Sequence, residues 1–290
     1  MGIHQVAILT KVDENCPDIN SIYKSKHLKK QDILDVLKSY KPQNKDASHL
    51  RILLIGPVGA GKSTFINSVD SVLQGRVAGR DLTDATTTSC TSFTKKYKTY
   101  KFSKGNQDHY SFVFNDIMGI EKMAGVHLDD IKLALKGHVK DRYKFNPEKQ
   151  LKAGDPDYNS SPDLNDKVHV LVMVVPASSM SLLSKDMLDK LRNVRMAASD
   201  LGIPQMAVLT KVEEACPEAK KNPNNIYKSK YLKRQVDQLN LLLGLPLNCI
   251  FLVKNYNSEI DTNAVTDAHI LCALKQMIVF GEDFLSHLND

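Results

Sequence analysis

The stretch from 51 to 63, RILLIGPVGAGKS, constrains the fold of this chain more than any other. Five mostly apolar residues run into a glycine-rich turn, which suits a buried central strand with helices on both faces. The turn matches G-x-x-x-x-G-K-[ST], a pattern that binds phosphate when a strand precedes it and a helix follows it. The sequence therefore predicts an α/β sheet built around residues 51–55, with a helix from the turn to about Gln74.

Strand and helix patterns alternate along the rest of the chain. Residues 91–102 and 109–116 are rich in Thr, Tyr and Phe and alternate in polarity, which predicts an antiparallel pair. Further strands are expected at 168–176, 204–210 and 248–253, and helices at about 181–201, 229–244 and 266–288. This order predicts an α/β fold of the P-loop NTPase G-domain type, with three layers, a mainly parallel sheet and one antiparallel strand pair.

The chain divides into two predicted parts. Residues 49–290 form the G domain, with a surface insertion at about 137–166 that is poor in apolar residues and has room for a short helix. Residues 1–48 hold a partial repeat with a strand and a short amphipathic helix at 32–40, and residues 41–49 are interpreted as a linker.

Composition narrows the classes of function. A formal net charge of +6 is too small to indicate a nucleic-acid partner by itself, so we do not expect one. The apolar runs are shorter than the roughly 18 residues that span a bilayer, so no transmembrane segment is expected. Five cysteines, an odd number at unpatterned spacings, predict reduced thiols in a cytoplasmic protein.

The phosphate loop is the first candidate site. Its glycines let backbone N–H groups approach a β-phosphate, Lys62 is expected to bridge β and γ oxygens, and Ser63 to offer its hydroxyl to Mg²⁺. The predicted nucleotide contacts in the loop are Gly56, Pro57, Val58, Gly59, Ala60, Gly61, Lys62, Ser63 and Thr64.

A nucleotide switch needs two further parts. Asp116 ends the predicted strand at 109–116 and is expected to hold the metal through water, while the N–H of Gly119 is expected to contact a γ-phosphate. The loop that contains Thr86, Thr87 and Thr88 offers a hydroxyl to the metal, with Thr87 or Thr88 preferred.

No catalytic residue is identified. GTP-hydrolysing domains of the small type place a glutamine after the glycine of Asp-x-x-Gly, and Ile120 stands there. Val58 also occupies a loop position where those enzymes usually keep glycine. We therefore expect hydrolysis to be slow unless a partner, or dimerisation with a second copy, supplies the missing group.

Several segments together resemble the GTP-binding region of the interferon-induced protein 44 family, and its 44-like members in particular: RILLIGPVGAGKS, TTTSCTSF, DIMGIE, VLTKV and LVKNY. The resemblance covers about residues 33–290. It implies a cytoplasmic, interferon-responsive protein of innate antiviral defence that binds GTP or GDP with Mg²⁺. In that family the G domain typically follows a TLDc domain, which we do not expect within these residues.

The base-reading motif departs from the usual pattern. Thr210, Lys211 and Glu213 stand where such domains read guanine, but Glu213 replaces an aspartate, and its extra methylene must tilt or retreat to accept two hydrogen bonds. Loss of one such bond removes about 1.5 to 3 kcal/mol of base discrimination. Lys254, within Val253-Lys254-Asn255, is the candidate for the last base-contacting loop.

A second copy of this motif precedes the phosphate loop. Residues 3–18 and 22–31 match residues 203–218 and 226–235 at 18 of 26 positions, and the first copy carries Asp13. It is a remnant of a preceding G domain, a strand that pairs with an open sheet edge, or a replacement for the resident strand. Chain order favours Thr210 to Glu213 as the working copy.

Two other functions stay open at this point. One is a nucleotide-independent interaction protein that keeps the G-domain fold. The other is an ATP-using P-loop enzyme, which Glu213 motivates.

Overall fold

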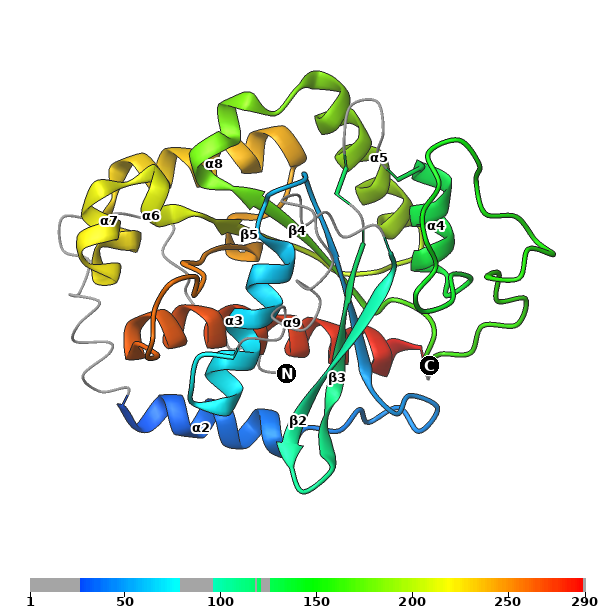
Figure 1. Ribbon diagram of the computed structural model, residues 1–290, viewed down its shortest axis with the longest axis horizontal. Coiled ribbons are helices and arrows are strands. Elements are labelled where there is room, and N and C mark those ends of the chain that lie inside the picture. The colour runs from blue at the N-terminus through cyan, green and yellow to red at the C-terminus, as the bar shows by residue number, and fades with distance from the viewer. Residues whose placement is uncertain (1–26, 79–95, 118, 121–125, 289–290) are drawn as a thin grey trace.

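The computed structural model describes residues 27–78, 96–117, 119–120 and 126–288. Its centre is a six-stranded sheet in the order β2-β3-β1-β4-β5-β6, in which β2 and β3 are antiparallel and all other neighbours are parallel (Figure 1). The strands are β1 (Leu50–Ile55), β2 (Lys98–Gly105), β3 (Asp108–Asp116), β4 (Val170–Pro176), β5 (Gln205–Thr210) and β6 (Ile250–Leu252). The predicted mainly parallel sheet with one antiparallel pair is confirmed.

Helices cover both faces of the sheet. The helices α2 (His27–Ser39), α3 (Lys62–Gln74) and α9 (Ala264–His287) lie on one face, and α4 (Leu128–Leu135), α5 (Lys185–Asp200) and α8 (Lys230–Leu243) lie on the other (Figure 1). Short helices fill the connections: η2 (Ala177–Leu182), α6 (Val212–Ala215), α7 (Pro217–Lys221), η3 (Pro223–Lys228) and η4 (Leu247–Cys249). The fold is therefore the three-layer G-domain type that the sequence predicts.

Strand β4 shows why this arrangement follows from the sequence. Val170, Val172 and Val174 point into the core beneath α3 and α9. The alternate residues Leu171 and Met173 point into the core beneath α5 and α8. Because both faces of the strand are covered, an uninterrupted apolar run is stable there, whereas a strand with one wet face would alternate.

One predicted helix is divided in the structure. The expected helix at 181–201 consists of the 3₁₀ helix η2 followed by α5, which begins at Lys185. The hydroxyl of Ser184 accepts a hydrogen bond from the Met187 N–H, so Ser184 caps α5 and ends the preceding turn.

The insertion at 137–166 is more ordered than its composition suggests. This segment, which the structure describes throughout, consists of turns and isolated bridges and contains no helix. Tyr143 and Phe145 are buried in the core against α4. The Arg142 N–H donates to the Tyr97 carbonyl at 2.7 Å, and the Tyr97 N–H donates to the Tyr143 carbonyl at 2.8 Å. The insertion thus covers the outer edge of the sheet where β2 begins.

The segment at 41–49, which the sequence predicts to be a linker, makes hydrogen bonds to the rest of the described chain. The Asn44 amide is buried and donates to the Leu285 carbonyl of α9 at 3.0 Å, and the Ser48 N–H donates to the Asn165 side chain at 2.7 Å. These contacts seat residues 41–49 against the G domain. The partial repeat at 3–18, with Asp13, lies outside the described residues.

Helix α9 combines length with an apolar composition. By length and composition it is long and apolar enough to cross a membrane, and no other helix of the described part of the chain is. In the structure Leu271, Leu274 and Met277 pack against the sheet, and more than half of the apolar window is buried. The apolar run is thus accounted for by core packing.

Candidate functional site

The phosphate loop lies at the switch point of the sheet. Strand β1 lies between β3 and β4. The chain leaves β1 toward β2 and β3 on one side, and it leaves β3 toward β4 and β5 on the other side. Open α/β sheets bind ligands outside the carboxyl ends of their strands at such a point. The loop from Gly56 to Ser63 follows the carboxyl end of β1 and leads into α3.

The backbone of the loop requires its glycines. Gly56, Gly59 and Gly61 have φ angles of 152, 73 and 87°, which other residues rarely adopt. A Cβ atom on Gly56 would also collide with the carbonyl oxygen of Val174 on β4. Helix α3 then begins without a side-chain cap and without an acidic residue in its first turn. Its N-terminal partial positive charge is therefore available to an anion.

Lys62 is folded back onto this loop. Its ammonium group is buried and donates to the carbonyls of Gly56 at 3.1 Å and Pro57 at 3.0 Å. Burial lowers the pKa of Lys62, and the carboxylate of Asp116 opposes that shift. A phosphate in the loop would give this cation stronger, charge-assisted hydrogen bonds than two neutral carbonyls do.

Ser63 and Asp116 meet beside the loop. The Ser63 hydroxyl donates to the Asp116 carboxylate at 2.5 Å, although the two residues come from α3 and β3. A hydroxyl and a carboxylate are hard oxygen ligands that suit Mg²⁺, which usually keeps several waters and takes phosphate oxygens as well. Among the described residues no cluster of three or more His, Cys, Asp or Glu offers a complete metal cage. The pair therefore fits a metal bound together with a nucleotide, while the candidates Thr86, Thr87 and Thr88 lie outside the described residues.

Gly119 packs directly on the phosphate loop. A Cβ atom on Gly119 would lie 2.7 Å from both the N and Cα atoms of Val58 and would collide with its side chain. The next residue, Ile120, donates its N–H to the Gly56 carbonyl at 3.0 Å and buries its side chain in the core. The position that usually orients an attacking water therefore points its aliphatic side chain away from solvent.

Two side chains tie the base-reading loops to the phosphate loop. The Thr210 hydroxyl donates to the Ala60 carbonyl at 2.5 Å, and the Asn255 amide donates to the Gly61 carbonyl at 3.3 Å. The structure thus places the Thr210 side chain on the phosphate loop. Asn255 belongs to the predicted base-contacting segment 253–255, in which Lys254 was the residue singled out. Its position directly after Lys254, in the loop that follows β6, is the sequence feature that indicates a contact with this site.

The charged residues of these loops are partly paired. Lys211 has a left-handed φ of 54° and lies 3.6 Å from the Glu214 carboxylate. Lys254 lies 2.7 Å from the Glu259 carboxylate. Although burial by itself would raise the pKa of Glu259, hydrogen bonds from the Asn257 N–H and from Lys254 lower it to about 2. Lys254 is thus paired with a carboxylate of its own loop in the candidate base-contacting loop.

Glu213 differs from its neighbours. Its Oε2 atom is buried and has no hydrogen-bond partner within the part of the chain that the structure describes. Burial raises the pKa of Glu213, and its own backbone N–H and the charge of Lys254 oppose the shift. A buried acceptor without a donor is costly, so this oxygen is suited to accept a hydrogen bond from a ligand.

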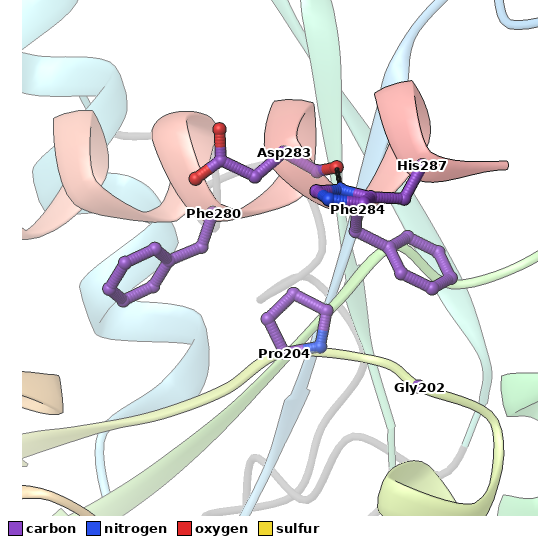
Figure 2. A pocket seen from close by; sticks show the side chains of 6 residues that line it. All are labelled: Gly202, Pro204, Phe280, Asp283, Phe284 and His287. Atoms are coloured by element: carbon purple, nitrogen blue, oxygen red, sulfur yellow. Dashed lines mark hydrogen bonds between the residues drawn. The ribbon is translucent and has the colours of Figure 1, made fainter. Parts of the chain in front are cut away.

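A separate shallow groove lies at the opposite end of the sheet. It has a volume of about 260 Å³ and is lined by Gly202, Pro204, Phe280, Asp283, Phe284 and His287 (Figure 2). These residues come from the turn before β5 and from the last turns of α9. Because this groove lies at the amino end of β5 and lacks the phosphate loop, it is not the candidate nucleotide site.

Fold and site together define a P-loop protein of the G-domain class. Over about nine-tenths of its length the chain is homologous to interferon-induced protein 44 and interferon-induced protein 44-like. It is 36% identical over 261 residues to interferon-induced protein 44 of Pan troglodytes and of Homo sapiens, which covers 89% of this chain and 58% of each relative. It is 34% identical over 280 residues to the human 44-like protein, which covers 96% of this chain and 61% of the relative.

These comparisons confirm the resemblance that the motifs indicate. The chain spans about 60% of the length of the curated relatives it matches. No protein-family model matches it. Among solved structures, a probable GTP-binding protein engB aligns with 14% identity and a TM-score of 0.40, covering 78% of this chain and 99% of the other.

Proposed function

We propose that this chain is a guanine-nucleotide-binding P-loop domain that takes GTP or GDP together with Mg²⁺ and hydrolyses GTP slowly on its own. The observation that carries the proposal is the pair of hydrogen bonds from Thr210 and Asn255 to the phosphate loop. They join the loop that would hold phosphates to the two loops that would hold a base. A single mononucleotide then contacts all three loops.

The chemistry of Glu213 supports guanine as the base. Guanine presents two donors, N1–H and N2–H, at the edge that a carboxylate reads, whereas adenine presents an acceptor at N1. An ionised Glu213 therefore favours guanine, and its unpartnered oxygen supplies an acceptor for one of the two donors. The metal would be held by Ser63 and, through water, by Asp116, where it would neutralise phosphate charge.

The same structure supports slow hydrolysis. Ile120 is buried and Val58 rests on Gly119, so neither residue positions a water. A partner protein, or a second copy of the chain, would then supply the group that activates water. The names of the relatives, which say that they are interferon-induced, support a role in an interferon response, and we propose that this role is antiviral. We place the protein in the cytoplasm, where Cys216, Cys249 and Cys272, which form no disulfide within the part of the chain that the structure describes, would stay reduced.

Isothermal titration with GTP, GDP and ATP in the presence of Mg²⁺ tests the proposal. We expect guanine nucleotides to bind and Lys62→Ala to lower their affinity by roughly a hundredfold, because a charge-assisted contact to phosphate is lost. Lys136→Ala, at an exposed lysine that ends α4, is the matched control and should bind normally. Wild-type affinity for GTP weaker than about a millimolar would reject the proposal.

The buried Ile120 also favours a second candidate, an interaction protein that keeps the fold and acts without nucleotide. A Lys62→Ala, Asp116→Ala double variant separates the two. Full antiviral activity of that variant in cells, with its fold intact by circular dichroism, would support the second candidate.

A further inference from the structure

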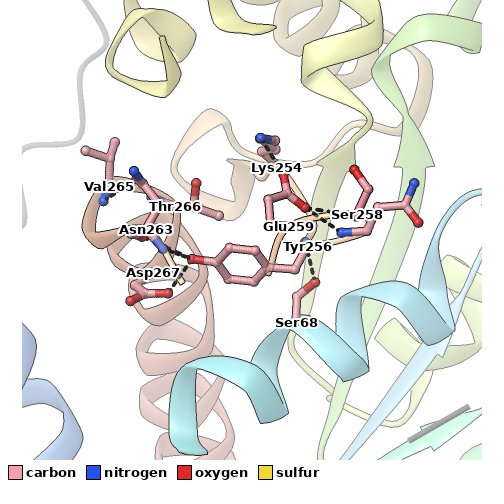
Figure 3. A network of polar contacts seen from close by, with 10 residues as sticks. Ser68, Lys254, Tyr256, Ser258, Glu259, Asn263, Val265, Thr266 and Asp267 are labelled. Carbon is pink, nitrogen blue, oxygen red and sulfur yellow. Dashed lines mark hydrogen bonds and ion pairs between the residues drawn. The ribbon is translucent and has the colours of Figure 1, made fainter. Parts of the chain in front are cut away.

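The loop between β6 and α9 is held by a chain of polar contacts that begins beside the phosphate loop. Figure 3 shows this network. The Tyr256 N–H donates to the Ser68 hydroxyl of α3 at 2.9 Å, and the same hydroxyl donates to the Thr64 carbonyl at 2.7 Å. Tyr256 directly follows Lys254 and Asn255. Its backbone position therefore sets where those two residues lie.

The side chain of Tyr256 links the base-contacting loop to the start of α9. The ring is buried, and its hydroxyl donates to the Asp267 carboxylate and accepts from the Asn263 N–H, both at 2.6 Å (Figure 3). Asn263 is itself the N-cap of α9 and accepts from the N–H groups of Val265 and Thr266. The start of α9 and the candidate base loop are therefore one hydrogen-bonded unit.

The network ends on a residue far away in the sequence. Asp267 is 1% exposed, and its second carboxylate oxygen accepts from the Lys30 ammonium of α2 at 2.6 Å. The Lys30 side chain is 31% exposed, so it reaches the buried acid from the surface. A buried carboxylate needs such a partner, because a lone charge in the protein interior is strongly disfavoured.

We propose that Lys30 is a positioning residue for the base-contacting loop, and that its ion pair with Asp267, rather than the docking of α2 as a whole, controls nucleotide binding. Lys30 holds the Asp267 carboxylate in place, Asp267 orients the Tyr256 hydroxyl, and Tyr256 holds Asn255 against the phosphate loop. Helix α2 then acts on the nucleotide site through the Lys30–Asp267 ion pair. This inference rests on the proposed function, because it names a regulator of the same site.

The contacts of α2 supply a matched control. Tyr40 directly follows α2, and its hydroxyl donates to the Glu282 carboxylate of α9 at 2.7 Å, so this contact also holds α2 against α9. It lies near the end of α9 that is far from the base-contacting loop. Tyr40→Phe should weaken α2 docking without touching the network. A purely structural role for Lys30 predicts that Lys30→Met and Tyr40→Phe behave alike.

The experiment measures GDP affinity and amide hydrogen exchange in four proteins: wild type, Lys30→Met, Lys30→Arg and Tyr40→Phe. We expect Lys30→Met to weaken GDP binding by about three- to tenfold and to speed exchange at the Tyr256 amide, since loss of one coupled contact has effects of this size. Lys30→Arg keeps the positive charge and should show the GDP affinity and the Tyr256 exchange rate of the wild type. Tyr40→Phe should leave both unchanged.

A double-mutant cycle gives a second test, and its Tyr256→Phe arm, which should weaken GDP binding by itself, does not depend on the folding of Lys30→Met. Tyr256→Phe removes only the hydroxyl, and adding Lys30→Met to it should weaken GDP binding no further. Additive losses in affinity, or a lower melting temperature with unchanged affinity and exchange in Lys30→Met, would overturn the inference. Exchange at Tyr256 is measured without nucleotide. If the wild type binds no guanine nucleotide, the exchange data still decide whether Lys30 holds the loop.

Discussion

The hydroxyl of Thr210, at the end of β5, donates to the main-chain oxygen of Ala60 in the phosphate loop, 150 residues earlier in the chain. Both atoms are buried. This bond joins the strand that leads to the base-reading motif with the loop that would hold phosphates. The Thr210 side chain therefore helps to fix the position of the base-reading motif relative to the phosphate loop.

Thr210→Val tests this bond. Valine has the same shape but no hydroxyl, so the buried Ala60 carbonyl loses this donor. We expect the free energy of unfolding to fall by about 1 to 2 kcal/mol and GDP affinity to fall by about three- to tenfold. Urea unfolding and titration calorimetry measure the two effects. Thr210→Ser keeps the hydroxyl and should retain most of the affinity; equal affinity in the valine variant would show that the bond does not organise the site.

Glu213→Asp should sharpen base selection. Removing one methylene lets the carboxylate accept from both N1–H and N2–H of guanine. We expect the ratio of GDP to ADP affinity to rise by roughly tenfold or more. Inosine diphosphate lacks the 2-amino group, so the GDP to IDP ratio reports the N2–H contact alone. An unchanged ratio in the aspartate variant would mean that residue 213 does not touch the base.

Base selection should also depend on pH. Burial raises the pKa of Glu213 above its ordinary value of 4.5, and only the ionised form accepts both guanine donors. Guanine preference should therefore be present at neutral pH and be lost as pH falls through the raised pKa, at a higher pH than a solvated glutamate would give. Affinities for GDP and ADP measured between pH 7.5 and 5 give the profile. Glu213→Gln should give weak, pH-independent preference, and an identical slope in that variant would assign the effect to another group.

Gly119→Ala should displace the phosphate loop, because Gly119 packs directly against Val58 of that loop. The new Cβ atom would lie 2.7 Å from the N and Cα atoms of Val58, so the loop or the Gly119 segment must move. We expect GTP affinity to fall by about tenfold or more and GDP affinity to fall less, because Gly119 is expected at the γ-phosphate. Adding Val58→Gly removes the side-chain clash but leaves the backbone one, so rescue should be partial. Full rescue would place the whole effect on the Val58 side chain.

Acid should destabilise the fold through His169. This ring is fully buried, its Nδ1 accepts from the Arg51 N–H, and its Nε2 contacts the Leu164 carbonyl, both at 2.9 Å. Burial lowers the pKa of His169 to about 4. The folded state thus favours the neutral ring, and this stability is fully present above the unfolded pKa of 6.5 and is lost as pH falls from 6.5 to about 4.

The expected loss over that range is about 3 kcal/mol from this residue. Urea unfolding at pH 7 and pH 4.5 measures it. His169→Gln should be less stable at pH 7 and show a shallower fall toward acid. His287→Gln, at an exposed ring, is the control and should keep the wild-type slope. A slope in His169→Gln equal to that of the wild type would assign the acid sensitivity elsewhere.

Much of the fold was predictable because it rests on local patterns. The continuous apolar run at 170–175 predicts a strand covered on both faces, and the glycines of the phosphate loop predict a turn that only glycine tolerates. The buried position of Ile120 was not predicted, but its aliphatic side chain already indicated that it does not orient water. The insertion at 137–166 was misjudged in one respect, since its few aromatic residues are enough to anchor it.

The sequence by itself determined the strands, the helices and the phosphate loop, because each depends on residues that are neighbours in the chain. Only the tertiary structure decided which distant residues meet: Thr210 with Ala60, Asn255 with Gly61, and Lys30 with Asp267. These pairs depend on the order of strands in the sheet and on where α2 and α9 cross it. Hydrophobic periodicity specifies that a face is buried but does not name the residues that face it, so polar contacts across layers emerge only when the layers are packed.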